Sequence, residues 1–167
     1  DLDLKILLKK FIYLAVSIGC MVFCLYFFSI PHLILTDVPY NLGLKNQHLS
    51  SCPETPNCVS SQEKYSQNSI QPITFEDSLE QAKERIYRVI NSMHGTRIIR
   101  KEFLYLHVEF TTQVLSFIDD VEFFFDGTQS LVHVRSASRR GYWDLGANRR
   151  RVETIRSEFK KLTNEID

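Results

Sequence analysis

The chain lacks the motifs that identify many enzymes and metal-binding proteins. No serine lies in a G-x-S-x-G turn, which would place a nucleophile above an α/β-hydrolase sheet. The histidines show no H-x3-H or similar metal-ligand spacing; they are His32, His48, His94, His107 and His133. The chain also has no internal repeat, and its 20 basic and 20 acidic residues give a formal net charge of zero. Bulk electrostatics therefore do not favour nucleic acid, and we expect no metal and no cofactor.

Positive charge is instead concentrated in one short segment. No lysine or arginine occurs between Glu102 and Val134, yet the segment RSASRRGYWDLGANRRR at residues 135–151 holds arginines at positions 135, 139, 140, 149, 150 and 151. The same segment contains small hydroxyl side chains and turn glycines. Packing alone does not require this composition, so we interpret the segment as a meeting of internal charges or as a site for an anion.

An apolar run near the N-terminus predicts a membrane anchor. The twenty residues from Phe11 to Ile30 carry no charge, and this length spans the bilayer core as a helix. Eleven of them are Phe, Ile, Leu or Val, each favouring insertion by roughly 0.3–0.6 kcal/mol. A cleaved signal peptide is the alternative, but its apolar core is usually shorter and ends in small residues. Here Tyr26, Phe27 and Phe28 occupy that position.

The lysines around the apolar run predict its orientation. Lys5, Lys9 and Lys10 precede it, and the first lysine after it is Lys45. Because positive residues favour the cytoplasmic side, we expect a single-pass protein with a cytoplasmic N-terminus. The rest of the chain would then lie in the periplasm or a lumen.

Two of the four cysteines predict a disulfide. Cys52 and Cys58 are separated by five residues, two of them prolines, and an extracytoplasmic compartment would be oxidising. A metal site is the alternative, although His48 is the sole further ligand nearby. Cys20 and Cys24 lie in the apolar run, where they serve as small apolar residues.

Composition divides the chain into three parts. Residues 1–35 form the anchor, and residues 36–71, rich in Ser, Asn, Gln and Pro, predict an extended linker that carries the cysteine loop. Residues 72–167 predict one folded domain.

This domain has the pattern of a two-layer α+β fold. Apolar residues recur every three or four positions from Phe75 to Met93, which predicts a helix that begins at a capping box of Thr74 and Asp77 and stops at Gly95. Alternating patterns predict an antiparallel sheet of three to four strands near residues 97–101, 103–111, 114–125 and 131–138. A C-terminal helix is predicted over residues 147–162. The Asp126-Gly127 pair predicts a hairpin.

The strand alternation also predicts a buried charge. Asp119 shares a face with Phe117, Val121 and other apolar residues, so its carboxylate needs a cation or hydrogen-bond donors. The next strand offers Arg135 and Arg139 as partners. The alternative is a bulge at Asp119-Asp120 that turns both carboxylates toward solvent.

Three motifs then occur in order along the chain. They are Pro56-Asn57-Cys58-Val59-Ser60-Ser61-Gln62, Phe117-Ile118-Asp119-Asp120-Val121-Glu122-Phe123, and Arg135-Ser136-Ala137-Ser138-Arg139 followed by Gly141, Asp144, Gly146, Asn148, Arg149 and Arg151. Together they resemble the family called domain of unknown function 1499. The resemblance implies a domain from about Leu49 to Leu162 in a family of bacterial envelope and plastid proteins without an agreed activity. Arg140 departs from the apolar residue that the family more often has there.

Two hypotheses for function follow. In the first, the domain is a binding or structural module that holds an anionic small molecule, a lipid headgroup or a protein partner. Its candidate anion-site residues are Arg135, Ser136, Ser138, Arg139, Asn148 and Arg149, and its candidate polar cluster is Asp119, Asp120 and Asp144.

In the second hypothesis, the domain is an extracytoplasmic hydrolase. Asp119 or Asp120 would act as the base, Ser136 or Ser138 as the nucleophile, and Arg135 or Arg139 as the oxyanion stabiliser. The missing nucleophile motif makes an enzyme the less favoured hypothesis.

Overall fold

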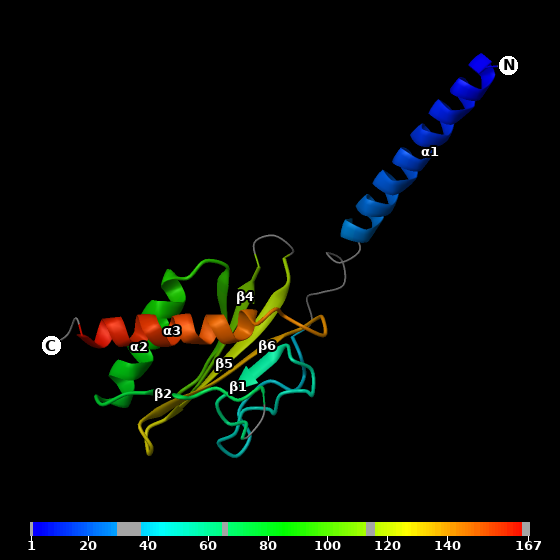
Figure 1. The fold of residues 1–167 in the computed structure, drawn as a ribbon. Helices are drawn as coiled ribbons and strands as arrows, with labels where there is room; N and C mark the ends of the chain where they lie inside the picture. The colour runs from blue at the N-terminus through cyan, green and yellow to red at the C-terminus, as the bar shows by residue number, and fades with distance from the viewer. Residues whose placement is uncertain (1, 30–37, 65–66, 113–115, 165–167) are drawn as a thin grey trace. The chain divides into compact units, whose positions relative to one another are not determined.

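The structure, a computed structural model, describes residues 2–29, 38–64, 67–112 and 116–164. The chain divides into two units, residues 1–37 and residues 38–167. The first unit contains helix α1, Leu2–Ser29 (Figure 1). Within α1, residues Ile6–Leu25 are long and apolar enough to cross a membrane, which a membrane anchor and a signal sequence would both satisfy. The predicted end of the apolar run at Ile30 lies outside the described residues.

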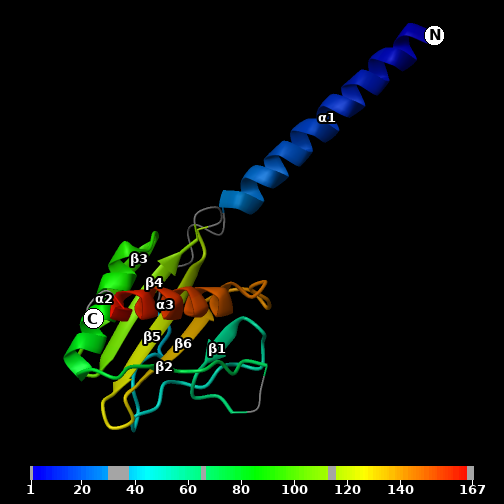
Figure 2. The ribbon, with the colours of Figure 1, turned by 60° about the vertical axis from the view of Figure 1, so that its left-hand side comes forward.

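The second unit is an antiparallel sheet with two helices. Its elements are β1 (Cys58–Ser60), β2 (Ile73–Thr74), α2 (Leu79–Ser92), β3 (Thr96–Lys101), β4 (Tyr105–Thr111), β5 (Ile118–Asp126), β6 (Leu131–Ser138) and α3 (Ala147–Asn164). The strands are ordered β1-β6-β5-β4-β3, and β2 pairs with the same edge of β6 as β1 does. Both helices lie on one face of the sheet (Figures 1 and 2). The predicted α+β class is confirmed, and β1 and β2 enlarge the predicted sheet to six strands.

Helix α2 begins later than the sequence predicts. Its N-cap is Ser78, whose hydroxyl oxygen accepts a hydrogen bond from the Gln81 backbone N–H. The Gln81 side-chain oxygen accepts in turn from the Ser78 backbone N–H, which completes a capping box. The predicted capping box of Thr74 and Asp77 was therefore wrong. Thr74 lies in β2, and Asp77 instead accepts hydrogen bonds from Arg85, about two turns into the helix.

The main core lies between the helices and the sheet. Buried apolar side chains from both helices pack on alternate residues of β4, β5 and β6; they include Ile86, Ile90, Val152, Ile155, Phe159, Leu106, Val108, Val121, Phe123, Phe125, Val132 and Val134. This packing follows the period of two in the strands and the three-to-four residue period in the helices.

Residues 38–57 cover part of the opposite face of the sheet. Leu49 packs on Tyr105 and Phe124, and the backbone N–H of Gly43 donates to Glu122 at 2.8 Å. Residues 38–71 thus belong to the same compact unit as the helices, although composition suggests an extended linker. The predicted disulfide joins Cys52 to Cys58.

Candidate functional site

The polar motif residues of β6 point alternately to the two faces of the sheet. Arg135 pairs with Glu122 of β5 in the sheet register, and Ser136 pairs with Val121. Arg135 and Arg139 therefore lie on the face covered by residues 38–57, whereas Ser136 and Ser138 lie under the helices. The sequence suggests one polar cluster, but the structure contains two. We call them the loop-face cluster and the helix-face cluster.

The helix-face cluster is centred on Asn148, which is fully buried in the first turn of α3. Its side-chain oxygen accepts from the Ser136 hydroxyl at 2.6 Å and from Arg151 at 2.7 Å. Its side-chain nitrogen donates to the Asn57 carbonyl at 3.0 Å, to Ser138 at 2.9 Å and to Asp144 at 2.9 Å. One amide thus joins the β1 loop, β6 and the start of α3.

Asp119 is buried, as the alternation predicts, but its partner is Arg151 of α3. Neither Arg135 nor Arg139 can reach it, because they lie on the other face of the sheet. The Arg151 guanidinium also lies over the Phe110 ring, 4.9 Å from its centroid. The bulge that would turn Asp119 outward is absent from the register of β5 with β4 and β6.

Asp144 and Arg149 stabilise the start of α3. Asp144 accepts from the backbone N–H groups of Gly146 and Asn148 at 2.8 and 2.7 Å, so its negative charge caps the positive end of the helix. Arg149 donates to the Gln67 and Ser69 carbonyls at 2.8 and 2.9 Å. Asp144 and Arg149, both predicted site residues, therefore form hydrogen bonds within the protein around the start of α3.

The loop-face cluster places three carboxylates and two arginines in the interior. Glu109, Asp120, Glu122 and Arg135 are each at most 4% exposed, and the Arg139 side chain is 5% exposed. Arg139 donates to both oxygens of Asp120 at 2.8 Å and also to Glu109. Arg135 donates to Glu122 at 3.0 Å.

Three further side chains complete the loop-face cluster. Tyr105 donates its hydroxyl to Glu122 at 2.7 Å, and His107 lies 2.7 Å from Asp120 through its Nε2 atom. The largely exposed Arg97 donates to Glu109 at 3.0 Å. Three carboxylates and three guanidinium groups thus meet in the cluster.

Burial and hydrogen bonds shift the pKa values of Asp120 and Tyr105 in this cluster. Burial opposes ionisation of Asp120, but hydrogen bonds from Arg139 and His107 outweigh it and hold the Asp120 pKa below its usual value. Burial, reinforced by Glu122, raises the pKa of Tyr105. Asp120 therefore stays charged and Tyr105 stays protonated at neutral pH.

The sequence analysis assigned no site role to Glu109, Glu122, His107 or Tyr105, although Glu122 lies within the second motif. The sequence pattern that marks three of them lies in β4, where Tyr105, His107 and Glu109 alternate with apolar residues. Such an alternation is usually read as a solvent-facing strand surface. The segment that covers this surface has no regular pattern that would reveal it.

A pocket of about 330 Å³ adjoins the loop-face cluster. It is lined by Pro39, Asn41, Leu42, Ser51, Cys52, Pro53, Asp120, Arg135, Ala137, Ser138 and Arg139. Within the described residues, the buried atoms Arg135 Nε and Arg139 Nη1 have no hydrogen-bond partner. The two arginines that line the pocket therefore each retain one donor without a partner, and both donor atoms are buried.

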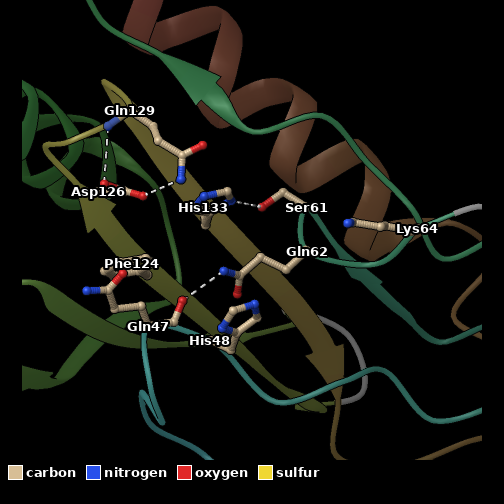
Figure 3. Close-up of a pocket in the computed structure, with 9 residues that line it drawn as sticks. All are labelled: Gln47, His48, Ser61, Gln62, Lys64, Phe124, Asp126, Gln129 and His133. Carbon is tan, nitrogen blue, oxygen red and sulfur yellow. Dashed lines mark hydrogen bonds between the residues drawn. The ribbon is translucent and has the colours of Figure 1, made fainter.

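A second pocket, of about 220 Å³, lies around His133 (Figure 3). His133 stacks on Phe124, and its Nδ1 atom is 3.2 Å from the Ser61 hydroxyl. Burial lowers the pKa of His133. Nearby Asp126 is engaged by Thr128 and Gln129, so it does not orient the imidazole as a catalytic triad requires.

The hydrolase arrangement suggested by the sequence is not assembled. Ser136 and Ser138 are both hydrogen-bonded to Asn148 on the helix face, whereas Asp120, Arg135 and Arg139 lie across the sheet. Asp119 lies on the same face of the sheet as Ser136 and Ser138, but it is paired with Arg151. In the part of the chain that the structure describes, no group of three His, Cys, Asp or Glu side chains is arranged to hold a metal ion.

Comparison with known protein families gives a match to the second unit. The sequence profile of the family described as "Protein of unknown function (DUF1499)" matches residues 48–159. No curated protein and no solved structure matches the chain. The matched range contains both polar clusters and the disulfide.

Proposed function

Because the chain belongs to the DUF1499 family, whose description assigns no activity, we propose a function from the geometry: the domain is a membrane-anchored, extracytoplasmic module that binds a small carboxylate in the pocket beside Arg135 and Arg139. The observation that carries this proposal is the pair of guanidinium groups on the pocket wall, each with one buried N–H that has no partner among the described residues.

Three features support the anchor and the compartment. Helix α1 is long and apolar enough to cross a membrane, lysines lie near its N-terminal end, and the next unit contains a disulfide, which persists in oxidising compartments. This combination favours an uncleaved anchor with the domain in a periplasm or lumen.

The charges around the pocket favour a single negative charge on the ligand. A guanidinium group binds a planar carboxylate well, and burial strengthens such contacts. However, the pocket wall also contains Asp120, and Glu122 contacts Arg135 nearby. A ligand with several negative charges would be repelled by these carboxylates, whereas one carboxylate adds little repulsion.

The pocket size favours a small ligand. Its volume lies at the lower end of the range for small-molecule sites, and its lining mixes arginine side chains with Leu42, Pro39 and Ala137. The charged end of the ligand would meet the arginines, and a short apolar part would meet these side chains.

The hydrolase is not proposed, because the base candidate Asp120 lies across the sheet from Ser136 and Ser138, and the other candidate, Asp119, is paired with Arg151. Of the predicted anion-site residues, Arg135, Ser138 and Arg139 line the pocket, whereas Ser136, Asn148 and Arg149 do not.

Calorimetric titration of the full chain in detergent micelles tests the proposal. The probes are acetate, butyrate and benzoate, with butyramide as a neutral control and succinate and inorganic phosphate as ligands of higher charge. We expect saturable binding of at least one monocarboxylate and no binding of butyramide.

A pocket-filling variant locates the binding. Ala137→Leu adds bulk to the pocket wall without removing any charge, whereas truncating Arg135 or Arg139 would leave a buried carboxylate uncompensated. Ser157→Leu, on the exposed side of α3, is the matched control. Equal binding by both variants, or no saturable binding of any monocarboxylate, would show that the pocket is not a carboxylate site.

A further inference from the structure

We propose that one end of the domain rests on an anionic phospholipid surface, through the loop that joins β6 to α3. We call residues 139–146 the aromatic loop, because Tyr142 and Trp143 are 73% and 64% exposed there, beside Leu145 at 65%. The inference rests on the proposed membrane anchor and is independent of the proposed ligand.

Exposed apolar side chains of the domain gather at this end. Among the described residues after α1, the large exposed apolar side chains are Val38, Tyr40, Ile98, Phe103, Phe117, Tyr142, Trp143 and Leu145. Single exposed apolar residues are normal on a protein surface. Here, however, all but Ile98 and Phe103 belong to three segments that converge.

The sheet register brings the first two segments together. Asp119 at the start of β5 pairs with Ser138 at the end of β6, and the Arg139 N–H donates to the Ile118 carbonyl at 3.1 Å. Phe117 and the aromatic loop therefore lie at the same end of the sheet, where β5 begins and β6 ends (Figures 1 and 2).

The third segment is the point where the chain enters the domain. Pro39 and Asn41 line one pocket together with Ser138 and Arg139, so residues 38–41 lie beside the end of β6. Only eight residues separate Val38 from Ser29, the last residue of α1. Even a fully extended segment of that length reaches only about 30 Å. An anchored chain therefore keeps this end of the domain close to the bilayer.

The chemistry of the aromatic loop suits a lipid interface. Tryptophan and tyrosine are enriched where proteins meet lipid headgroups, because their rings are apolar and their tips are polar. Exposed Arg140 precedes Tyr142, and exposed Arg150 donates to the Leu145 carbonyl at 2.7 Å. Basic side chains next to the aromatic residues favour anionic headgroups.

The helix-face cluster holds the aromatic loop in place. Asn57 donates to the Gly141 carbonyl, and Asp144 accepts from the Gly146 N–H. Gly141 and Gly146 have φ angles of 86° and 77°, a conformation that glycine adopts without strain. Because the loop ends are fixed in this way, Tyr142 and Trp143 are presented to the outside. In this proposal, the buried residues of the sequence motifs hold the aromatic loop in the position that contacts the lipid surface.

The sole tryptophan of the chain makes the proposal directly measurable. The full chain is reconstituted into phosphatidylcholine vesicles with or without phosphatidylglycerol, and Trp143 emission is recorded. Lipids brominated near the glycerol end of the acyl chains serve as quenchers. Interfacial side chains reach roughly 5–10 Å into the headgroup and acyl boundary, so we expect about twofold quenching in anionic vesicles.

Two variants define the surface. The double variant Arg140→Gln/Arg150→Gln should lose most of the quenching in anionic vesicles. Phe103→Ser, which removes an exposed apolar side chain from the loop between β3 and β4, should retain it. Quenching that is the same with neutral lipids, or unchanged in the double variant, would overturn the role of anionic headgroups.

Flotation after an alkaline wash separates the two proposals. A chain that fails to float with the vesicles lacks the anchor, which overturns the proposed function and this inference together. A chain that floats while Trp143 remains unquenched by lipid and accessible to acrylamide retains the anchor but overturns the docking.

Discussion

Replacement of Asn148 is the sharpest test of the helix-face cluster. In Asn148→Ala, five side-chain hydrogen bonds are lost from a fully buried position. In Asn148→Asp, the shape and the accepting oxygen remain, but the donating nitrogen becomes a second oxygen. That oxygen would face the Asp144 carboxylate and the Asn57 carbonyl. We therefore expect the aspartate variant to be less stable than the alanine variant.

The cost of Asn148→Ala follows from which partners keep another contact. The Asn57 carbonyl still accepts from the Ser138 N–H, Arg151 still donates to Ser136 and Asp119, and Asp144 still caps α3. The Ser136 hydroxyl loses its acceptor. Since a net hydrogen bond contributes roughly 0.5–1.5 kcal/mol and an orphaned buried group costs about 1–3 kcal/mol, the total loss is about 3 kcal/mol. For a domain of this size, that corresponds to a fall in Tm of about 10 °C.

Thermal unfolding of the full chain in detergent, followed by circular dichroism, measures this loss. Asn91→Ala is the matched control, because Asn91 is exposed on α2. Its Tm should stay close to that of the unmodified chain. An Asn148→Asp variant as stable as Asn148→Ala would refute the assigned orientation of the amide, and an unchanged Tm in both would refute the role of the cluster.

Two further predictions concern the covalent and ionic contacts of the loop face. Replacing both Cys52 and Cys58 with alanine should destabilise the domain by about 2 kcal/mol, which is the chain-entropy value for so short a loop. The variant should also lose the effect of reductant on Tm. A Tm that still falls with reductant would contradict this role of the disulfide. The Asp120 pKa lies below its usual value, so its contribution to stability is present above about pH 4 and is lost as the pH falls through the folded-state pKa. The Tm difference between the unmodified chain and Asp120→Asn should therefore narrow as the pH falls from about 4 toward 2. A Tm difference that stays constant over this range would show that Asp120 is not held ionised by its partners.

Much of the domain fold was predictable because its core follows simple periods. The amphipathic pattern of α2 and the alternation in β4, β5 and β6 indicated their types, and the predicted limits differ by a few residues. The start of α2 was misplaced because Thr74 and Asp77 carry a capping pattern as plausible as that of Ser78 and Gln81. Tertiary pairing of Thr74 in β2 decides between them.

The two polar clusters show what the sequence pattern could not supply. The period of two correctly turned Asp119 inward, and it also implied that Ser136 and Arg135 face opposite ways. It gave no sign that Arg151, distant in the sequence, would return to Asp119 through packing of α3. It also gave no sign that residues 38–57 would cover the strand face that carries Glu109, Asp120 and Glu122. Covering by an irregular segment leaves no periodic signal.

The two edges of the sheet have different consequences for self-association. The β6 edge is occupied by β1 and β2, whereas β3 has a neighbouring strand on one side only among the described strands. An unpaired edge can recruit the same edge of another molecule, and confinement to a membrane would raise the frequency of such encounters. The β3 sequence is TRIIRK, and its register shifts between Ile98 and Arg100. Three positive side chains and an irregular ladder disfavour the joining of two copies into one continuous sheet.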